Sequence, residues 1–202
     1  MIRTLSIIVI VVMLAGCTVS SLSPEDVLAK METAESYWAE ARMAVKNNKS
    51  VFYYNLKQFY KQQDKFRVEF YDDYGNLKQT MIYNNGQCGI YHDKIDKPFK
   101  TQNFIDAKEH NSFITTFVGY YNKDPEAKWS KGKINDEEYY VFRCSIENKN
   151  SFFSGAELYV SSKNAIPKML CIYGEDGRKT MEVEYKSFEY NRSFDDSLFF
   201  IE

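Results

Sequence analysis

The sequence has few of the residues that carry out catalysis. Among its 202 residues there are only two histidines, His92 and His110, and no HExxH, GxSxG or P-loop pattern. Cys88 could be a nucleophile with either histidine as its base, but Cys88 and His92 lie four residues apart on one expected strand. That spacing corresponds to about 13 Å, which is too long for a shared hydrogen bond. We therefore predict no catalytic residue and a protein that is not an enzyme.

The chain also lacks an apolar run long enough to cross a membrane. The run from Leu5 to Ala15 has about 11 residues, whereas a transmembrane helix needs about 20. Arg3 precedes this run, and Leu14-Ala15-Gly16-Cys17 closes it with a tetrapeptide that resembles the lipobox of bacterial lipoproteins. We expect cleavage before Cys17, lipidation of Cys17 and a domain held outside the cytoplasm by its lipid. The predicted segments are a signal peptide over 1–16, a lipidated tether over 17–22 and one domain over 23–202.

Cysteine is scarce as well. Besides Cys17 the sequence has Cys88, Cys144 and Cys171, with no CxxC pair that would indicate a zinc or thioredoxin-like site. Cys144 and Cys171 fall on expected strands and could be bridged, although buried free cysteines are the more common arrangement.

Acidic pairs are present, but they do not indicate a metal site. Asp72-Asp73 and Glu175-Asp176 both precede a glycine in an expected hairpin turn, where acids are ordinary. Neither pair continues with the spaced oxygen ligands of a calcium-binding loop. We predict no metal and no cofactor.

Charge is nearly balanced, with 26 basic and 28 acidic side chains and a net charge of −2. A nucleic-acid-binding face would need an excess of basic residues, so nucleic acid is not an expected partner. Aromatic residues are abundant instead: the chain has 16 tyrosines and 15 phenylalanines, many of which alternate with Lys, Glu and Asn. This alternation favours strands over helices.

A helix is expected at the start of the domain. Ser23 is a suitable N-cap, Pro24 suits the first helical position, and Glu25 and Asp26 complement the helix dipole. Apolar residues then recur at a spacing of three and four, which predicts one long amphipathic helix that ends near Lys46. The apolar positions are Val27, Leu28, Met31, Ala34, Trp38, Ala41 and Val45.

From Ser50 onward the apolar period is two, which predicts strands. Turn sequences such as Asn84-Asn85-Gly86 and Glu175-Asp176-Gly177 join the strands as hairpins, because Asn-Gly and Asp-Gly favour positive φ. The expected strands cover 51–60, 66–71, 77–83, 87–92, 128–133, 140–146, 156–160, 169–173 and 181–185.

The alternation stops between Lys97-Pro98 and Asp124-Pro125. Apolar residues there, including Phe104 and Phe117, predict one or two short helices that are interrupted near His110-Asn111. The whole order predicts an α+β fold: a curved antiparallel sheet, or half-barrel, with the long N-terminal helix and the helical insertion against its concave face.

Several short segments carry a resemblance to a known family. They are Lys65-Phe66-Arg67-Val68-Glu69, Ile82-Tyr83-Asn84-Asn85-Gly86, Leu158-Tyr159-Val160, Ile166-Pro167-Lys168 and Ser193-Phe194-Asp195-Asp196-Ser197-Leu198-Phe199. With the order of elements, they make the domain similar to the LolA/LolB family of lipoprotein carriers, which also includes sensor domains. Carriers of this family hold acyl chains in the concavity. The resemblance implies that Arg67 bonds the lid helices and gates that cavity, although Arg67 could equally be a solvated strand residue.

Size, lipobox and domain type are further similar to the GerS-like spore-germination lipoproteins of clostridia. That resemblance implies a non-catalytic protein of the spore or forespore envelope. Its implied partner is a zinc-dependent N-acetylmuramoyl-L-alanine amidase of the CwlD type, which it would bind and activate for cortex modification and germination. Two alternatives stay open. One is a carrier or chaperone that holds acyl chains in the concave sheet, and the other is an envelope-stress sensor.

A protein without catalytic motifs must act through its surface. The concave face and the edge strands are the candidates, and edge strands can pair with a partner or with a second copy as an edge-paired or swapped homodimer. Surplus tyrosines that cannot all be core residues favour a protein interface. These tyrosines are Tyr53, Tyr54, Tyr71, Tyr139 and Tyr159. The sequence does not identify the residues that would contact the partner.

Overall fold

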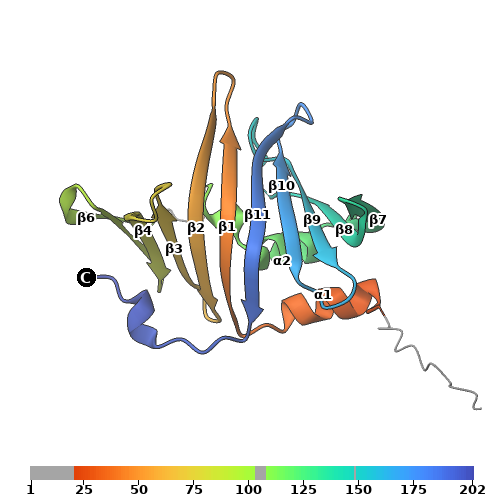
Figure 1. Cartoon of the computed structure of the whole chain (residues 1–202), viewed down its shortest axis with the longest axis horizontal. Coiled ribbons are helices and arrows are strands. Elements are labelled where there is room, and N and C mark those ends of the chain that lie inside the picture. The colour runs from red at the N-terminus through yellow and green to blue at the C-terminus, as the bar shows by residue number, and fades with distance from the viewer. Residues whose placement is uncertain (1–20, 103–107, 148) are drawn as a thin grey trace, which may run out of the picture.

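The computed structural model describes residues 21–102, 108–147 and 149–202 (Figure 1). In the described part, eleven strands form one antiparallel sheet in the order β6-β5-β4-β3-β2-β1-β11-β10-β9-β8-β7, accompanied by two α-helices and two short 3₁₀ helices. The predicted α+β fold, with one large antiparallel sheet and a helical insertion, is confirmed. The predicted signal peptide, Cys17 and most of the tether lie outside the described residues.

The elements divide into two halves around the helical insertion. The first half comprises α1 (Pro24–Glu32), β1 (Ser36–Lys46), β2 (Val51–Lys61), β3 (Lys65–Tyr71), β4 (Leu77–Asn84), β5 (Gln87–His92) and β6 (Ile95–Thr101). The insertion comprises η1 (His110–Ser112) and α2 (Ile114–Lys123). The second half comprises β7 (Lys128–Ile134), β8 (Glu137–Ser145), β9 (Gly155–Ser161), β10 (Pro167–Tyr173), β11 (Lys179–Tyr190) and η2 (Asp196–Phe199). Neither α1 nor α2 is long and apolar enough to cross a membrane.

The N-terminal helix starts as predicted but is much shorter. Ser23 and Asp26 form a reciprocal capping box, and the helix ends at Glu32 with Thr33 as its C-cap. The prediction of a helix to Lys46 is wrong, because the rest of that segment forms β1. Its apolar residues fit a period of two as well as one of 3.6, and the burial of alternate residues decides between them. The buried alternate residues are Tyr37, Ala39, Ala41 and Met43.

The two edge strands of the sheet carry proline or charge. β6 was not predicted: its residues are mostly exposed, so they show no apolar alternation. Pro98 lies within β6, where an edge position tolerates a residue without an N–H. β7 at the other edge contains Lys128, Lys131 and Lys133. Lysines and proline at sheet edges oppose pairing with other chains.

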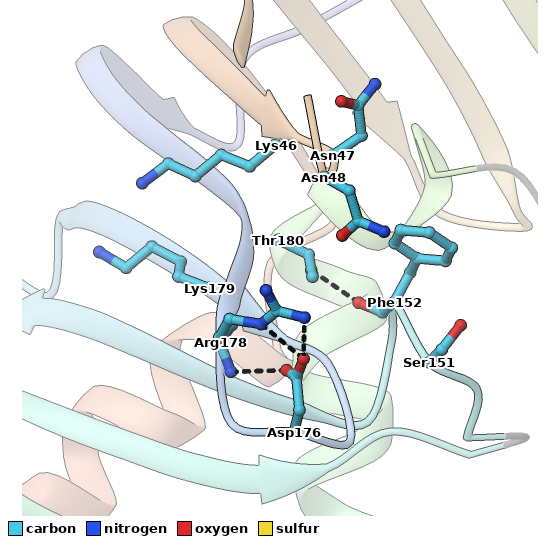
Figure 2. A pocket seen from close by; sticks show the side chains of 9 residues that line it. All are labelled: Lys46, Asn47, Asn48, Ser151, Phe152, Asp176, Arg178, Lys179 and Thr180. Atoms are coloured by element: carbon cyan, nitrogen blue, oxygen red, sulfur yellow. Dashed lines mark hydrogen bonds and ion pairs between the residues drawn. The ribbon is translucent and has the colours of Figure 1, made fainter. Parts of the chain in front are cut away.

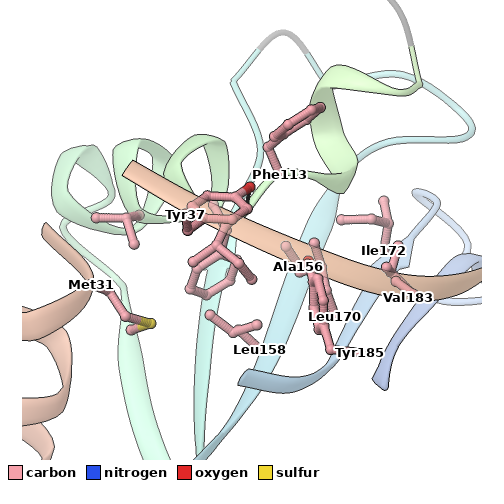
Figure 3. Packing of buried hydrophobic residues seen from close by; sticks show 14 of the residues in the cluster. Met31, Tyr37, Phe113, Ala156, Leu158, Leu170, Ile172, Val183 and Tyr185 are labelled. Atoms are coloured by element: carbon pink, nitrogen blue, oxygen red, sulfur yellow. Dashed lines mark hydrogen bonds between the residues drawn. The ribbon is translucent and has the colours of Figure 1, made fainter. Parts of the chain in front are cut away.

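The two faces of the sheet are covered differently. We call the face against which α2 packs the inner face and the opposite one the outer face. The main hydrophobic core lies on the inner face, where the helices add residues to those of the strands (Figure 3). Large side chains that are almost fully buried there include Met31, Tyr37, Phe113, Phe117, Leu158, Leu170 and Ile172. Each such side chain contributes about 1.5–3 kcal/mol by leaving water, so the helices are part of the folded core.

The outer face of the first half is covered by the end of the chain, residues 191–202, which we call the C-terminal strap. Phe194 of the strap packs edge-on against Phe59 of β2, with ring centroids 5.7 Å apart. Phe199 is completely buried. A Cβ atom at Gly89 would meet Ile201 at 2.9 Å, so this glycine allows the strap to lie close to β5. The strap therefore forms a second, smaller apolar layer on the sheet.

Candidate functional site

The inner face, where a carrier would hold acyl chains, is occupied by the helical insertion. Phe113, Ile114 and Phe117 of the insertion are at most 2% exposed. The rings of Phe66 on β3 and Phe113 meet edge to face, with centroids 5.0 Å apart. The insertion thus fills this part of the concavity with its own side chains. The segment that includes Phe104, which was also predicted to be helical, lies outside the described residues.

Buried hydrogen bonds fix the insertion to the sheet. Gln58 of β2 donates through Nε2 to the carbonyl and hydroxyl oxygens of Ser112, at 3.0 and 2.8 Å. Tyr185 of β11 donates its hydroxyl to the same carbonyl at 2.9 Å, and the N–H of Ile114 donates to the Tyr37 hydroxyl at 3.1 Å. Leaving a buried polar group unpaired costs about 1–3 kcal/mol, so these bonds hold the insertion in place.

A hollow of about 430 Å³ remains beside α2, between this helix and the β2–β3 hairpin. Its size lies within the range of small-molecule sites, about 300–1,000 Å³. Burial lowers the pKa of His110 in its wall to about 4, so this imidazole is neutral at pH 7. The residues that line the hollow are Tyr60, Asp64, Phe66, His110, Thr115, Thr116, Gly119, Tyr120, Lys123 and Glu147.

The residues considered for chemistry are not arranged as a reactive centre. Cys88, Cys144 and Cys171 are free and buried, so the described cysteines form no bridge, as expected. Burial raises the pKa of the Cys88 thiol to about 11 and that of Cys144 to about 12, which suppresses the reactive thiolate. His92 accepts a hydrogen bond from the N–H of Lys94 in the turn after β5. Across the described ranges, no group of three or more His, Cys, Asp or Glu residues could hold a metal ion.

The acidic turn residues serve the turns in which they lie. Asp72 accepts hydrogen bonds from the N–H groups of Tyr74 and Asn76, at 2.9 and 2.8 Å. Hydrogen bonds from the Asn76 side chain and from these two N–H groups lower the pKa of Asp72. Asp176 accepts from the N–H and guanidinium of Arg178, which likewise lowers the Asp176 pKa. The structure therefore supports the turn interpretation of both acidic pairs.

Arg67 lies on the outer face and contacts the C-terminal strap. Its guanidinium donates to the Glu69 carboxylate at 2.6 and 2.8 Å and to the carbonyl oxygen of Leu198 at 3.1 Å. Asp196 of the strap adds ion pairs with Lys61 and Lys65 at 2.6 and 3.2 Å. These contacts clamp the strap on the face opposite to α2. The gating role that the family resemblance implied for Arg67 stays a prediction.

Most of the tyrosines singled out in the sequence have partners within the protein. Tyr71, Tyr139 and Tyr159 each donate their hydroxyl to the glutamate two residues earlier on the same face of their strand, at 2.5, 2.6 and 3.4 Å. Tyr54 packs edge-on against Phe70 of the inner core, whereas Tyr53 is 61% exposed. Three of these five tyrosines are therefore explained by hydrogen bonds to glutamate on the outer face, without a partner protein.

The chain enters the domain at one end of the sheet. The N–H of Leu22 donates to the carbonyl of Ser162 at 2.7 Å, and the Tyr140 hydroxyl donates to the carbonyl of Leu22 at 2.9 Å. Leu22 is thus bound to the turn after β9, beside α1 (Figure 1). The turns after β1 and β10 lie at the opposite end of the sheet (Figure 1).

A groove lies at this second end, which we call the distal groove. It consists of two neighbouring hollows of about 200 and 410 Å³, and Figure 2 shows the smaller one. Lys46, Asn47, Phe152 and Thr180 line both hollows. Asn48, Ser151, Asp176, Arg178 and Lys179 complete the smaller hollow, and Val45, Lys108, Glu109, Phe153 and Met181 complete the larger one. No sequence pattern indicated this groove, because its walls come from four separate segments.

The sequence matches the family model "Sporulation protein YdcC-like" over residues 1–199. The chain belongs to this YdcC-like sporulation family. It is 23% identical over 194 residues to Sporulation protein YdcC of Bacillus subtilis (strain 168), and the match covers 94% of this chain and 56% of that protein. The YdcC-like chain described here thus spans just over half the length of this relative.

Solved structures show which fold this YdcC-like chain shares. One similar chain occurs in the structure of the CwlD amidase from Clostridioides difficile in complex with the GerS lipoprotein, with a TM-score of 0.50, 23% identity and coverage of 83% of this chain and 93% of that one. A putative outer membrane lipoprotein-sorting protein domain from Vibrio parahaemolyticus has a TM-score of 0.50, 11% identity and coverage of 87% and 93%. An uncharacterised conserved protein from Thermus thermophilus has a TM-score of 0.55, 10% identity and coverage of 86% and 91%. The predicted LolA/LolB-like fold is thereby confirmed.

Proposed function

We propose that this YdcC-like protein is a lipid-anchored, extracytoplasmic binding protein that binds and activates a cell-wall N-acetylmuramoyl-L-alanine amidase during sporulation. The observation that carries the proposal is the filled inner face, where Phe113 and Phe117 occupy space that a carrier needs for acyl chains. Membership of the sporulation family supports the process. The amidase–lipoprotein complex among the similar structures supports the kind of partner.

The side-chain chemistry supports a role in binding instead of catalysis. The Cys88 thiol is protonated at pH 7, because burial holds its pKa near 11. His110 is buried in the wall of the hollow beside α2, and His92 lies in a surface turn. In this proposal the amidase supplies the catalytic residues and its own zinc, and the present chain supplies a surface.

The entry of the chain supports an anchor close to the domain. Leu22 is bonded to the sheet and follows Cys17 by five residues. A fully extended chain covers at most about 3.6 Å per residue, so a lipid on Cys17 would hold the Leu22 end within about 18 Å of the membrane. The distal groove would then face away from the membrane.

The direct test is to mix the purified protein with the CwlD-type amidase of the same organism. We expect a complex by size-exclusion chromatography and faster peptide release from cortex peptidoglycan than with the amidase alone. The protein alone should release nothing. A lack of complex formation, or hydrolysis by this protein alone, would overturn the proposal.

The lipid anchor is tested by labelling cells with radioactive palmitate. Label should appear on the natural chain and on a Cys144→Ala control, and it should be lost from Cys17→Ala. If Cys17→Ala keeps its label, the lipidation site lies elsewhere. A homodimer through an edge or swapped strand stays a prediction, which sedimentation of the same samples will test.

The alternative function as a lipid or lipoprotein carrier is supported by the 430 Å³ hollow beside α2. Gly119 lines this hollow, and a Cβ atom there would have no neighbour within 4 Å, so Gly119→Leu is a variant that fills the space without a clash at Cβ. A carrier should bind a fluorescent acyl probe and lose that binding in Gly119→Leu. Under our proposal neither protein binds the probe.

A further inference from the structure

Phe152 gives the distal groove an apolar wall, and a second half-exposed phenylalanine, Phe52, lies on the neighbouring β1–β2 hairpin. Phe152 lines both hollows and is 47% exposed. Phe52, 48% exposed, is paired across the β1–β2 hairpin with Val45, which lines the larger hollow together with Met181. The larger hollow measures about 410 Å³, which leaves room for one large apolar side chain from outside. Anchors of this kind supply much of the binding energy at protein interfaces.

The rim of the distal groove is positively charged. Its lining includes four cationic side chains and two carboxylates, although the whole chain has a net charge of −2. Three of these cations are paired: Arg178 with Asp176 and Lys179 with Glu182, each at 2.6 Å, and Lys108 with Glu109 at 3.8 Å (Figure 2 shows the first pair). No ion pair joins Lys46 to a carboxylate of the described residues. Lys46 is therefore the cationic side chain of the groove that is available for an acidic partner.

The wall of the groove is held in one conformation. Asn150 accepts hydrogen bonds from the N–H groups of Phe152 and Phe153, at 2.9 and 3.0 Å. The Thr180 hydroxyl donates to the carbonyl oxygen of Phe152 at 2.6 Å, a bond drawn in Figure 2. A Cβ atom at Gly174 would collide with the carbonyl of Ser151, so a glycine is needed where the two turns meet. A wall formed before binding reduces the entropy cost of association.

We infer that the distal groove is the docking site for an acidic segment of a partner protein. One large apolar side chain of that segment enters the hollow beside Phe152, and a flanking carboxylate pairs with Lys46. The inference deepens the proposed function by giving its contact surface, and it rests on that function for the identity of the partner as an amidase. The opposite position of Leu22 supports it, since an anchored domain would present this end to partners away from the membrane.

Photo-crosslinking in sporulating cells tests the inference with the full chain. A photoreactive phenylalanine replaces Phe152 in one strain and Phe99 in a control strain, since Phe99 on β6 is also exposed, at 64%. We expect position 152 to crosslink to one protein through a net acidic peptide, and position 99 to give no such product. Absence of a crosslink at 152, crosslinking to lipid or to a second copy, or an equal product at 99 would overturn the inference.

Charge reversal gives a second, quantitative test on the isolated complex. Lys46→Glu should weaken binding of the crosslinked partner by about tenfold, and that loss should shrink as salt increases. The matched control is Lys128→Glu. Lys128 is also exposed but lies on β7, outside the groove, so this change should leave the affinity unchanged. Equal affinity of Lys46→Glu and the natural protein would contradict the inference.

The outcomes separate this inference from the proposed function. If the amidase binds and crosslinks elsewhere, the groove is not the docking site, yet the proposed function stands. If the groove crosslinks to an acidic segment of a protein that is not an amidase, the docking site stands and the proposed function fails.

Discussion

The hydroxyl of Tyr185 and the carbonyl oxygen of Ser112 lie 2.9 Å apart in a buried hydrogen bond that spans 73 positions of sequence. The bond connects β11, in the middle of the sheet, to the helical insertion. Gln58 donates to the same carbonyl from β2. One backbone oxygen of the insertion is therefore held by two strands, which explains how a short helix stays seated in the concavity.

Replacing Tyr185 by phenylalanine should test this connection. The change removes one of two donors to the Ser112 carbonyl with little change of shape, so we expect the free energy of unfolding to fall by about 1 kcal/mol. Tyr159→Phe is the control, because its bond to Glu157 is long, at 3.4 Å. Urea denaturation of both variants measures the difference. If both variants lose the same free energy of unfolding, the Tyr185–Ser112 hydrogen bond does not contribute more than an ordinary surface bond.

The C-terminal strap should loosen when Asp196 loses its charge. Asp196→Asn removes the ion pairs with Lys61 and Lys65, and we expect faster hydrogen exchange at the strap amides of Leu198 and Phe200. Exchange in the central strands should not change. Asp93→Asn, which removes an ion pair with Lys78 elsewhere, is the control. Unchanged strap amides in Asp196→Asn would show that apolar packing alone holds the strap.

Stability should decrease as the pH falls from about 6.5 to about 4. Burial lowers the pKa of His110 to about 4, whereas an unfolded histidine titrates near 6.5. In this window the unfolded chain binds the extra proton, so acid favours unfolding by up to about 3 kcal/mol. His110→Gln should flatten the profile. A flat profile for the natural protein would contradict the burial of His110. The lowered pKa of carboxyl groups such as Asp124 acts mainly below pH 4.

The buried thiols should react only after unfolding. Cys88, Cys144 and Cys171 are shielded, and burial raises the pKa of each thiol. We expect no modification of these three by iodoacetamide at pH 7.5 in buffer, and complete modification in denaturant. Mass spectrometry of peptides measures each position separately. Rapid labelling of any one in buffer would show that its strand opens locally.

Replacing Gly174 or Gly119 by alanine should change the stability of the protein in opposite directions. Gly174→Ala places a Cβ against the Ser151 carbonyl, so we expect lower stability and a displaced wall of the distal groove. Gly119 lies within α2 with open space around it, so Gly119→Ala should stabilise the protein by about 0.5–1 kcal/mol. Thermal unfolding measures both. A stable Gly174→Ala variant would mean that the 149–153 loop adapts easily.

The sequence predicted the hairpins well because local chemistry determines them. Asn85 and Gly86 both adopt positive φ in the turn after β4, as their residue types suggested. The region after Thr33 was misassigned because its apolar residues fit both periods, and pairing with β2 and β11 decided the outcome. β6 was missed because an exposed edge strand has no apolar alternation.

The candidate surfaces were harder to predict than the fold. Lys46, Phe152 and Arg178 are distant in sequence and meet only because the turns after β1, β8 and β10 gather at one end of the sheet. Arg67 was singled out through a resemblance, but its partner Leu198 belongs to a strap that no periodicity indicates. Long-range contacts of this kind are not encoded in local sequence patterns.

The open margins of the sheet also determine how copies of the protein behave toward one another. A strand from a second molecule that approaches β6 finds no N–H donor at Pro98. When two copies of β7 approach each other, the three lysines of one strand repel the three lysines of the other. Ribbon-like growth from either margin is therefore suppressed. An open-ended stack of copies is thus disfavoured, whereas a discrete pair of molecules stays open to the sedimentation test.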